Sequence, residues 1–200
     1  METQDLDALV IAGGESRRMG GPKALLPMGD TTILGTILSL LQPMFRNVIV
    51  VARETKSFAW LGSEVLADDR PERGPLVGLA RGLAASDAPW CFVVGCDMPL
   101  LQAGVIGRMC ENLDGCDILV PYLDGRLQSL HAFYSRKCLS VAENLLDNGT
   151  TSLRDLFPLC KVRTMVTGDF LDIDPEMLSF KDIDTKDDYV AALKLADRRS

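Results

Sequence analysis

A short segment rich in glycine and basic residues, 13–23, offers the clearest chemistry in this sequence. It holds three cations and one acidic residue, which leaves a local charge of +2, whereas the 200-residue chain carries -7. Glycines let backbone N–H groups approach an anion closely, and the cations attract negative charge. The segment therefore predicts a polyphosphate site, with a solvated surface turn as the alternative. Its glycines and cations are Gly13, Gly14, Gly20, Gly21, Arg17, Arg18 and Lys23.

Two common phosphate-binding motifs do not fit this segment. Lys23 follows Pro22 and precedes Ala24, whereas a Walker A motif places its lysine between Gly and Ser or Thr. The chain also lacks the GxGxxG pattern that binds dinucleotides, which argues against a dinucleotide-dependent oxidoreductase. A polyphosphate would therefore be bound by a different kind of loop.

A carboxylate follows one of the apolar runs of the chain. Residues 90–95 read WCFVVG, and Asp97 comes just after them. Mg²⁺ is commonly held by one or two carboxylates together with phosphate oxygens of a substrate. Asp97 is therefore our candidate metal ligand. The alternative is that it caps the next helix, a position at which aspartate is favoured.

A third candidate loop, 68–78, joins a short apolar run to a helix-length segment. Asp68 is its candidate ligand-binding carboxylate, and the adjacent Asp69 is an alternative to it. Gly74 and Pro75 suit the start of a helix, whose N–H groups would then face a ligand. A solvated acidic turn is the other interpretation of this loop.

Apolar strands must place these loops. We predict strands at 6–12, 47–52, 64–67, 90–95 and 117–122, because the runs are continuously apolar, as in strands covered on both faces. Helix-length segments at 31–45, 54–61, 75–86 and 102–113 alternate with them, which predicts an α/β fold with a mostly parallel sheet. In such sheets, ligands bind beyond the carboxyl ends of the strands.

The second half departs from this alternation. An Asp-Gly turn at 124–125 precedes a strand-like run at 129–134, which predicts an antiparallel excursion. Further along, we expect helices at 136–147, 151–157 and 185–196 and strands at 162–167 and 180–183. Without a linker or repeat, residues 1–200 are expected to form a single domain.

Composition excludes several classes of protein. The charge of -7 has the wrong sign for broad binding to nucleic acid. No apolar run approaches the ~18 residues of a membrane span, and the acidic start differs from a signal peptide, so we expect a cytoplasmic protein that binds no membrane. Six cysteines without a CxxC pair, beside one histidine, favour buried thiols over a zinc site.

Residues 12–29 resemble the signature of nucleotidyltransferases, and most closely that of molybdenum cofactor guanylyltransferases. They read AGGESRRMGGPKALLPMG, and the family motif is LAGG-x-S-x-RMG-x-x-K-x-L. Three further segments, CDMP (96–99), LDGRLQSLHAFYS (123–135) and FKDIDTKDDY (180–189), are similar to family elements. The resemblance implies a three-layer, Rossmann-like fold of the glycosyltransferase-A type, with a nucleotide-binding half (1–100) and an acceptor-binding half (101–200).

The resemblance also implies roles for residues. Asp97 would hold Mg²⁺, and Asp68 would contact the nucleotide. The catalytic set it implies is Arg18, Lys23 and Asp97. The nucleotide-binding set is Ile11, Ala12, Gly13, Gly14, Lys23, Asp68 and Asp97. For the acceptor, the resembling segments supply His131, Asp182 and Asp184.

The chain departs from the family pattern at several positions, and one residue within a resembling segment has an alternative role. Asp182 and Asp184 replace two asparagines, and two aspartates facing one way would repel a phosphate-bearing acceptor unless a metal or a cation intervened. An asparagine frequent after the second strand is absent, and Arg53 is a candidate to replace its contact. His131 has no acidic neighbour in sequence, so packing is an alternative role for it.

The reaction implied is transfer of GMP from GTP to the terminal phosphate of a molybdopterin-type acceptor, with release of pyrophosphate. An anionic phosphate nucleophile requires alignment and charge neutralisation but no general base, which suits a chain with one histidine. Cytidylyl or uridylyl transfer to molybdopterin or a sugar phosphate is an alternative, and a catalytically inactive nucleotide-binding adaptor is another. Transient contacts with other cofactor-biosynthesis proteins or molybdoenzyme chaperones are also expected.

Overall fold

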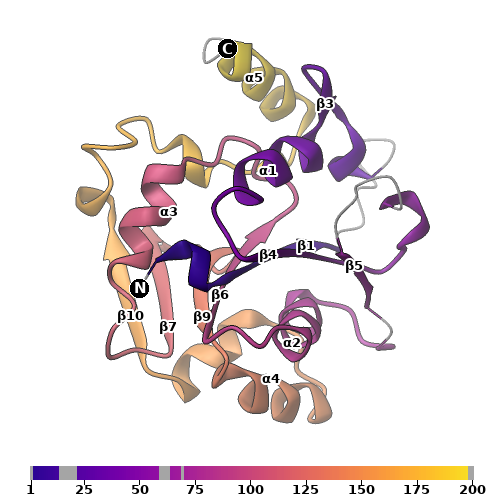
Figure 1. Ribbon diagram of the computed structural model, residues 1–200, viewed down its shortest axis with the longest axis vertical. Coiled ribbons are helices and arrows are strands. Elements are labelled where there is room, and N and C mark those ends of the chain that lie inside the picture. Colours follow the sequence, from indigo (N-terminus) through magenta and orange to yellow (C-terminus); the bar gives the residue numbers. More distant parts are fainter. Residues whose placement is uncertain (1, 14–21, 59–63, 69, 198–200) are drawn as a thin grey trace.

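The computed structural model describes residues 2–13, 22–58, 64–68 and 70–197. Within them, eight strands form one sheet, ordered β10-β7-β9-β6-β1-β4-β5, with β8 paired to β7 (Figure 1). The strands are β1 (Asp7–Ala12), β4 (Asn47–Ala52), β5 (Glu64–Ala67), β6 (Trp90–Gly95), β7 (Ile118–Leu123), β8 (Arg126–Leu127), β9 (His131–Ser135) and β10 (Val162–Val166). The pairs β1–β4, β1–β6, β4–β5 and β7–β10 are parallel, which confirms the α/β fold with a mostly parallel sheet.

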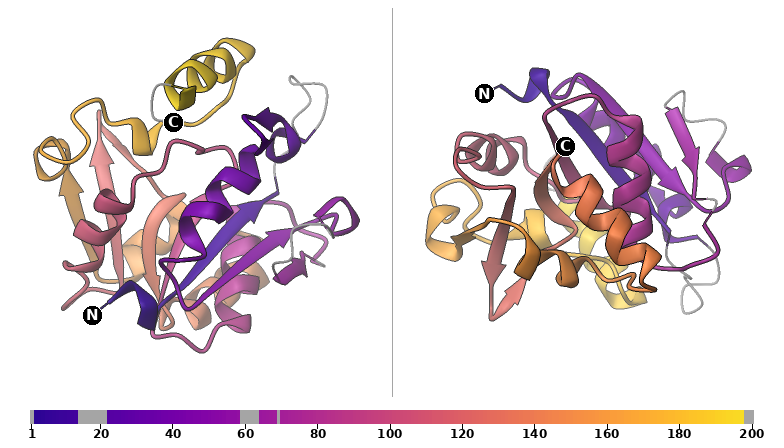
Figure 2. Two further views of the ribbon diagram at one scale, coloured as in Figure 1. Left: turned by 45° about the horizontal axis from the view of Figure 1, so that its top comes forward. Right: turned by 90° about the horizontal axis from the view of Figure 1, so that it is seen from below.

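Helices cover both faces of the sheet, as Figures 1 and 2 show. Alternate side chains of β1 point to opposite faces: Val10 joins the core beneath α1 and α3, and Leu9 joins the core beneath α2 and α4. Burial on both faces explains why the strands are apolar at every position. The helices are α1 (Ile33–Leu41), α2 (Pro75–Ala85), α3 (Ala103–Cys110), α4 (Cys138–Asp147) and α5 (Lys186–Asp197).

The expected antiparallel excursion is confirmed. Asp124 and Gly125 both have positive φ, 48° and 77°, which is the backbone of a tight hairpin turn. The turn joins β7 to the short β8, and β9 then runs antiparallel to both β6 and β7. The chain therefore reverses once inside the sheet and returns to the parallel direction.

Several predicted elements differ in detail. Residues 31–32 belong to a hairpin of β2 (Pro27–Met28) and β3 (Thr31–Thr32), so the first helix begins at Ile33, where the Thr32 hydroxyl accepts the Gly35 N–H at 3.0 Å. The helix predicted at 151–157 is a 3₁₀ helix, Leu153–Leu159. Within the segment predicted as a helix at 54–61, the described part holds a 3₁₀ turn, Lys56–Phe58.

The strand predicted at 180–183 is wrong. The chain forms a 3₁₀ turn at Leu178–Phe180, and residues 181–184 follow as irregular backbone. The buried Asp174 carboxylate accepts the N–H groups of Leu178 at 3.0 Å and Ser179 at 2.8 Å, which closes this turn. No helix in the described parts of the chain is both long enough and apolar enough to span a membrane.

Candidate active site

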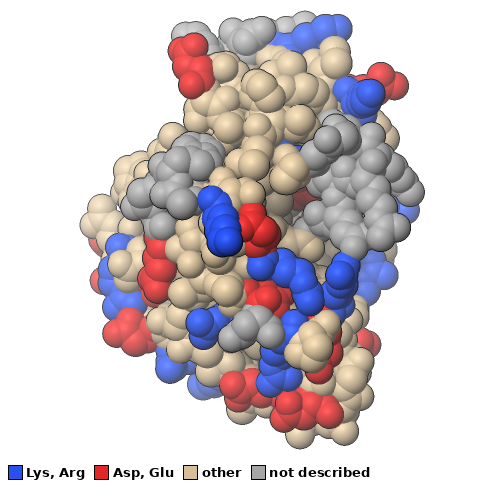
Figure 3. All heavy atoms as spheres, turned by 90° about the vertical axis from the view of Figure 1, so that its right-hand side faces the viewer, with Lys and Arg blue, Asp and Glu red and all other residues tan. Residues whose placement is uncertain are grey.

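A pocket of about 440 Å³ lies at the carboxyl ends of β1, β4, β5 and β6. Its volume is in the usual range for small-molecule sites, about 300–1,000 Å³. Residues 11–13 line it at the exit of β1, and residues from each of the three predicted loops line it elsewhere. On the face shown in Figure 3, Lys and Arg side chains gather close to Asp and Glu side chains. The pocket therefore combines apolar walls with charges of both signs.

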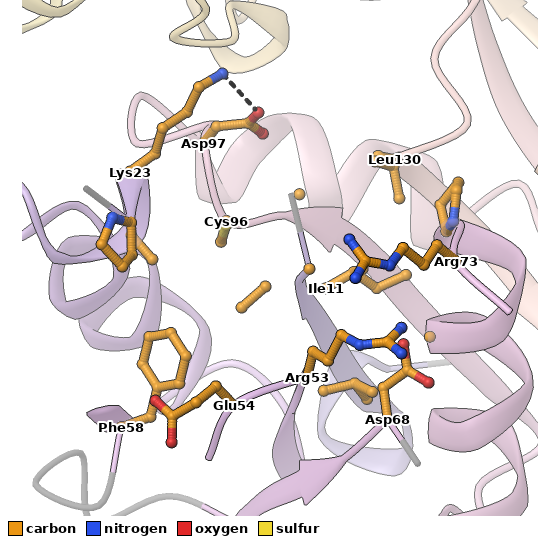
Figure 4. A pocket seen from close by; sticks show the side chains of 18 of the residues that line it. Ile11, Lys23, Arg53, Glu54, Phe58, Asp68, Arg73, Cys96, Asp97 and Leu130 are labelled. Carbon is orange, nitrogen blue, oxygen red and sulfur yellow. Dashed lines mark ion pairs between the residues drawn. The ribbon is translucent and has the colours of Figure 1, made fainter. Parts of the chain in front are cut away.

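Asp97 and Lys23 meet at one end of the pocket. Lys23 Nζ lies 3.7 Å from Asp97 Oδ2, an ion pair drawn as a dashed line in Figure 4. The Cys96 N–H donates to the Ile11 carbonyl at 3.1 Å, which holds the turn after β6 against β1. Gly95 makes room for the carboxylate, because a Cβ there would lie 2.6 Å from Asp97 Oδ1.

The charges at this end influence one another. Burial raises the pKa of the Asp97 carboxyl, and the Lys23 ammonium partly offsets that effect. Burial also opposes the charge of Lys23, but a hydrogen bond to Asp184 and the charge of Asp97 together raise the pKa of Lys23. The lysine is therefore cationic at neutral pH, and its charge is balanced by the two carboxylates beside it.

Asp68 lines the opposite part of the pocket together with two arginines. Its N–H donates to the Ala52 carbonyl at 2.9 Å, which continues the β4–β5 pairing and brings residues 53 and 68 to neighbouring strand ends. Arg53 and Arg73 line the same pocket (Figure 4), and Arg53 Nη1 donates to the Glu72 carbonyl at 3.3 Å. The sequence did not single out Arg73 as a site residue, although the structure places it in the pocket.

The first turn of α2 forms another part of the wall. Gly74 has φ of 154°, and a Cβ there would lie 2.5 Å from the Thr151 carbonyl oxygen. The Leu76 N–H donates to that same carbonyl at 3.2 Å. Gly78 packs against Ile11, since its added Cβ would lie 3.1 Å from that side chain. These glycines let α2 approach both β1 and the loop after α4.

Some predicted site residues are not among the described residues that line this pocket. Gly14, Arg18 and the alternative Asp69 lie outside the described residues. His131 is fully buried, with its ring 5.1 Å from that of Phe92 and 4.5 Å from that of Phe180. Burial lowers the pKa of His131 to about 3. The side chain offers no exposed surface to an acceptor, and its contacts with two aromatic rings agree with the alternative role in packing.

Asp184 lies beside Lys23. Its Oδ1 accepts a hydrogen bond from Lys23 Nζ at 2.6 Å. The N–H of Ile183, which lies between Asp182 and Asp184, donates to the Asp97 carbonyl at 2.9 Å. Asp182 is exposed, and burial of part of its carboxyl, followed by the charge of Asp184, raises its pKa. The segment expected to contact the acceptor therefore lies against Lys23 and Asp97, although neither Asp182 nor Asp184 lines the pocket.

The family model described as the MobA-like NTP transferase domain matches residues 8–162. The chain belongs to this family. It is 31% identical to a probable molybdenum cofactor guanylyltransferase of Pelotomaculum thermopropionicum, over 94% of this chain and 92% of that protein. A molybdenum cofactor guanylyltransferase of Desulfosudis oleivorans is 30% identical, over 92% of each chain. The resemblance found in the sequence is thereby confirmed, and the chain is a member of a nucleotidyltransferase family.

Solved structures support the same fold. Molybdopterin-guanine dinucleotide biosynthesis protein A from Archaeoglobus fulgidus superimposes with a TM-score of 0.84 at 23% identity, covering 96% of this chain and 99% of that one. A Mycobacterium tuberculosis protein in complex with manganese gives a TM-score of 0.66 at 21% identity, covering 97% and 100%. At these identities, the likeness concerns the fold.

Proposed function

We propose that this protein transfers GMP from GTP to the phosphate of a molybdopterin-type acceptor and releases pyrophosphate. The observation that carries the proposal is the meeting of Lys23 and Asp97, 3.7 Å apart, at one end of a pocket framed by the strand-exit loops. A cation and a carboxylate at one end of a pocket suit a substrate that brings both phosphate and a metal ion. The names of the relatives supply GTP and the acceptor.

The carboxylates present fit a magnesium ion. Asp97 lines the pocket with 29% of its side chain exposed, and among the described residues no group of three His, Cys, Asp or Glu side chains is placed to hold a metal, either at this site or elsewhere. Mg²⁺ suits such a sparse set, because it keeps waters and takes oxygens from substrate phosphates. When bound, the ion would neutralise charge on the triphosphate. One solved structure of the same fold is a manganese complex.

The residues of this chain then have defined roles. Residues 11–13 and Asp68 would position the nucleoside, and Lys23 would balance charge on the triphosphate. An oxygen of the acceptor phosphate attacks the α-phosphorus, the bond between that phosphorus and its bridging oxygen breaks, and pyrophosphate leaves with the electron pair. The nucleophile is already anionic, so the reaction needs alignment and no proton acceptor. Within residues 13–23, Arg18 remains a proposed contributor of positive charge.

The test is a substrate matrix. The purified protein is incubated with Mg²⁺, with each of the four ribonucleoside triphosphates, and with molybdopterin, molybdenum cofactor or a sugar phosphate, and pyrophosphate is measured. We expect release only with GTP and a molybdopterin-type acceptor. Release with CTP in place of GTP would replace guanylyl by cytidylyl transfer, and nucleotide binding without any release would favour the adaptor.

We also propose that the protein acts in the cytoplasm and makes transient contacts with other cofactor-biosynthesis proteins or molybdoenzyme chaperones. The compartment follows the expectation from the sequence, and the contacts follow from the resemblance.

A further inference from the structure

Lys23 lies between two carboxylates that come from distant parts of the chain. Its Nζ is 2.6 Å from Asp184 Oδ1 and 3.7 Å from Asp97 Oδ2. The lysine side chain is 15% exposed, whereas those of Asp97 and Asp184 are 29% and 64% exposed. The ammonium is therefore enclosed while each carboxylate keeps access to solvent. Two negative charges flank one positive charge at this point.

The segment that carries Asp184 is fixed to the site at several points. The Ile183 N–H donates to the Asp97 carbonyl at 2.9 Å. The Asp188 carboxylate accepts the N–H groups of Asp184 at 3.2 Å and Thr185 at 2.7 Å, which shapes the turn into α5. From α5, the Tyr189 hydroxyl donates to the Pro27 carbonyl, a few residues after Lys23. The position of the Asp184 carboxylate is thus set by backbone contacts on both sides of it.

A carboxylate at residue 184 binds the Lys23 ammonium more strongly than the asparagine of the family pattern would. An amide oxygen accepts a hydrogen bond from an ammonium but carries no charge, whereas a carboxylate forms a stronger, charge-assisted hydrogen bond. Asp97, which lines the pocket, is also the carboxylate proposed to receive a divalent cation, and Asp184 adds a second negative charge beside the same ammonium. Ammonium and metal ion therefore compete for one negatively charged position.

We propose that Asp184 is a positioning residue that holds the Lys23 ammonium against Asp97 until a divalent cation binds and displaces the ammonium. The inference rests on the proposed function, because it assumes that Asp97 receives the metal. Displacement would free Lys23 to interact with the phosphates of the nucleotide that arrives with the ion. Metal entry and the placement of Lys23 are thereby coupled.

The first experiment measures Mn²⁺ binding to the nucleotide-free protein, by the loss of the free-ion electron paramagnetic resonance signal. Lys23→Met removes the competing charge and keeps the side-chain length, so we expect Mn²⁺ to bind about tenfold more tightly than to the wild type, the effect of losing one charged hydrogen bond. Lys186→Met, at an exposed lysine on α5, is the matched control and is expected to change nothing. Equal affinity of the wild type and the Lys23→Met protein would overturn the inference.

The second experiment observes the lysine itself. In ¹⁵N-resolved spectra, a lysine ammonium that is enclosed in an ion pair exchanges its protons slowly enough to be seen, and Lys23→Arg assigns the signal. We expect a Lys23 signal in the metal-free wild type that Mg²⁺ weakens and that Asp184→Asn removes. Asp182→Asn removes the same charge from the same segment without removing a hydrogen bond to Lys23, and it should retain the signal. A protected signal in Asp184→Asn would refute the positioning role.

Thermal melts establish that each variant is folded, and Lys23→Gln provides a second neutral substitution should Lys23→Met lose stability. Failure of the inference and failure of the proposed function give different results. If Mn²⁺ binds all variants equally while the wild type still releases pyrophosphate, only the coupling is wrong. If Mn²⁺ binds none of them and activity needs no divalent ion, the metal role of Asp97 is wrong.

Discussion

Asp97→Asn would separate the chemical role of this residue from its contribution to the fold. Asparagine keeps the size and shape of the side chain and removes its charge. If Asp97 holds the metal, loss of one electrostatic contact that matters in the transition state should lower kcat by about 10²–10³-fold. The Lys23 ammonium would remain, but its partner 3.7 Å away would be neutral.

The structure predicts that this substitution costs little stability. Burial raises the pKa of Asp97, which means that the folded state disfavours its charged form, and removing the charge relieves that penalty. The ion pair with Lys23 is lost at the same time. Because 29% of Asp97 is exposed and the atoms are 3.7 Å apart, the pair contributes about 1 kcal/mol or less. The two effects oppose each other, so the unfolding free energy should change by less than about 1 kcal/mol.

Activity is measured as pyrophosphate release with Mg²⁺, and stability by urea unfolding of the same preparation. Asp114→Asn is the matched control, because Asp114 is an exposed carboxylate in the loop before the amino end of β7, away from the pocket. We expect the control to behave as the wild type in both assays. Asp97→Asn with most of the wild-type activity would refute the metal assignment, and an unfolded variant would show that the energetic reasoning is wrong.

Two further predictions concern the frame that holds the site. Gly74→Ala places a Cβ 2.5 Å from the Thr151 carbonyl oxygen, at a residue with φ of 154°. We expect it to lower the free energy of unfolding, measured in urea, by about 2 kcal/mol or more. Gly107→Ala adds a Cβ in open space within α3 and should raise the free energy of unfolding by about 0.5–1 kcal/mol. Equal effects would contradict the strain argument. Burial of Asp7 acts to raise its pKa, but hydrogen bonds, led by that of Arg46, lower the pKa below its ordinary value. The Asp7 carboxylate therefore stabilises the fold at pH values above its ordinary pKa, and this stabilisation is lost as pH falls through its lower pKa in the folded state. Acid titrations of the Asp7→Asn protein should lack this loss of stability.

The first half of the fold could be predicted because its signals are local. Strands β4, β5 and β6 have the predicted bounds, since continuous apolar runs between polar turns leave few other structures open to them. The strand predicted at 180–183 failed for a non-local reason. The buried Asp174 carboxylate, four residues before Leu178, closes a 3₁₀ turn there, and no periodicity in the sequence reports that aspartate's burial.

The candidate site was predictable to the extent that strand order determines it. Parallel strands bring their exit loops to one edge, where ligands are expected to bind, and the structure places Lys23 and Asp97 from two of these loops in one pocket. Their chemical roles stay predictions. Arg73 and Phe58 also line the pocket, but they come from loops whose course depends on tertiary packing. In the sequence alone, neither an arginine at 73 nor a phenylalanine at 58 indicates a ligand site.

The contacts around the pocket join the two halves into which the sequence was divided. Asp184 accepts from Lys23, and the Tyr189 hydroxyl donates to the Pro27 carbonyl. The Leu76 N–H at the start of α2 likewise donates to Thr151, in the second half. Because both ends of the pocket are thus held by residues beyond 100, substitutions in the second half should alter how the nucleotide binds as well as how the acceptor binds. The aspartate that replaces a family asparagine at 184 therefore bears on the phosphate end of the site.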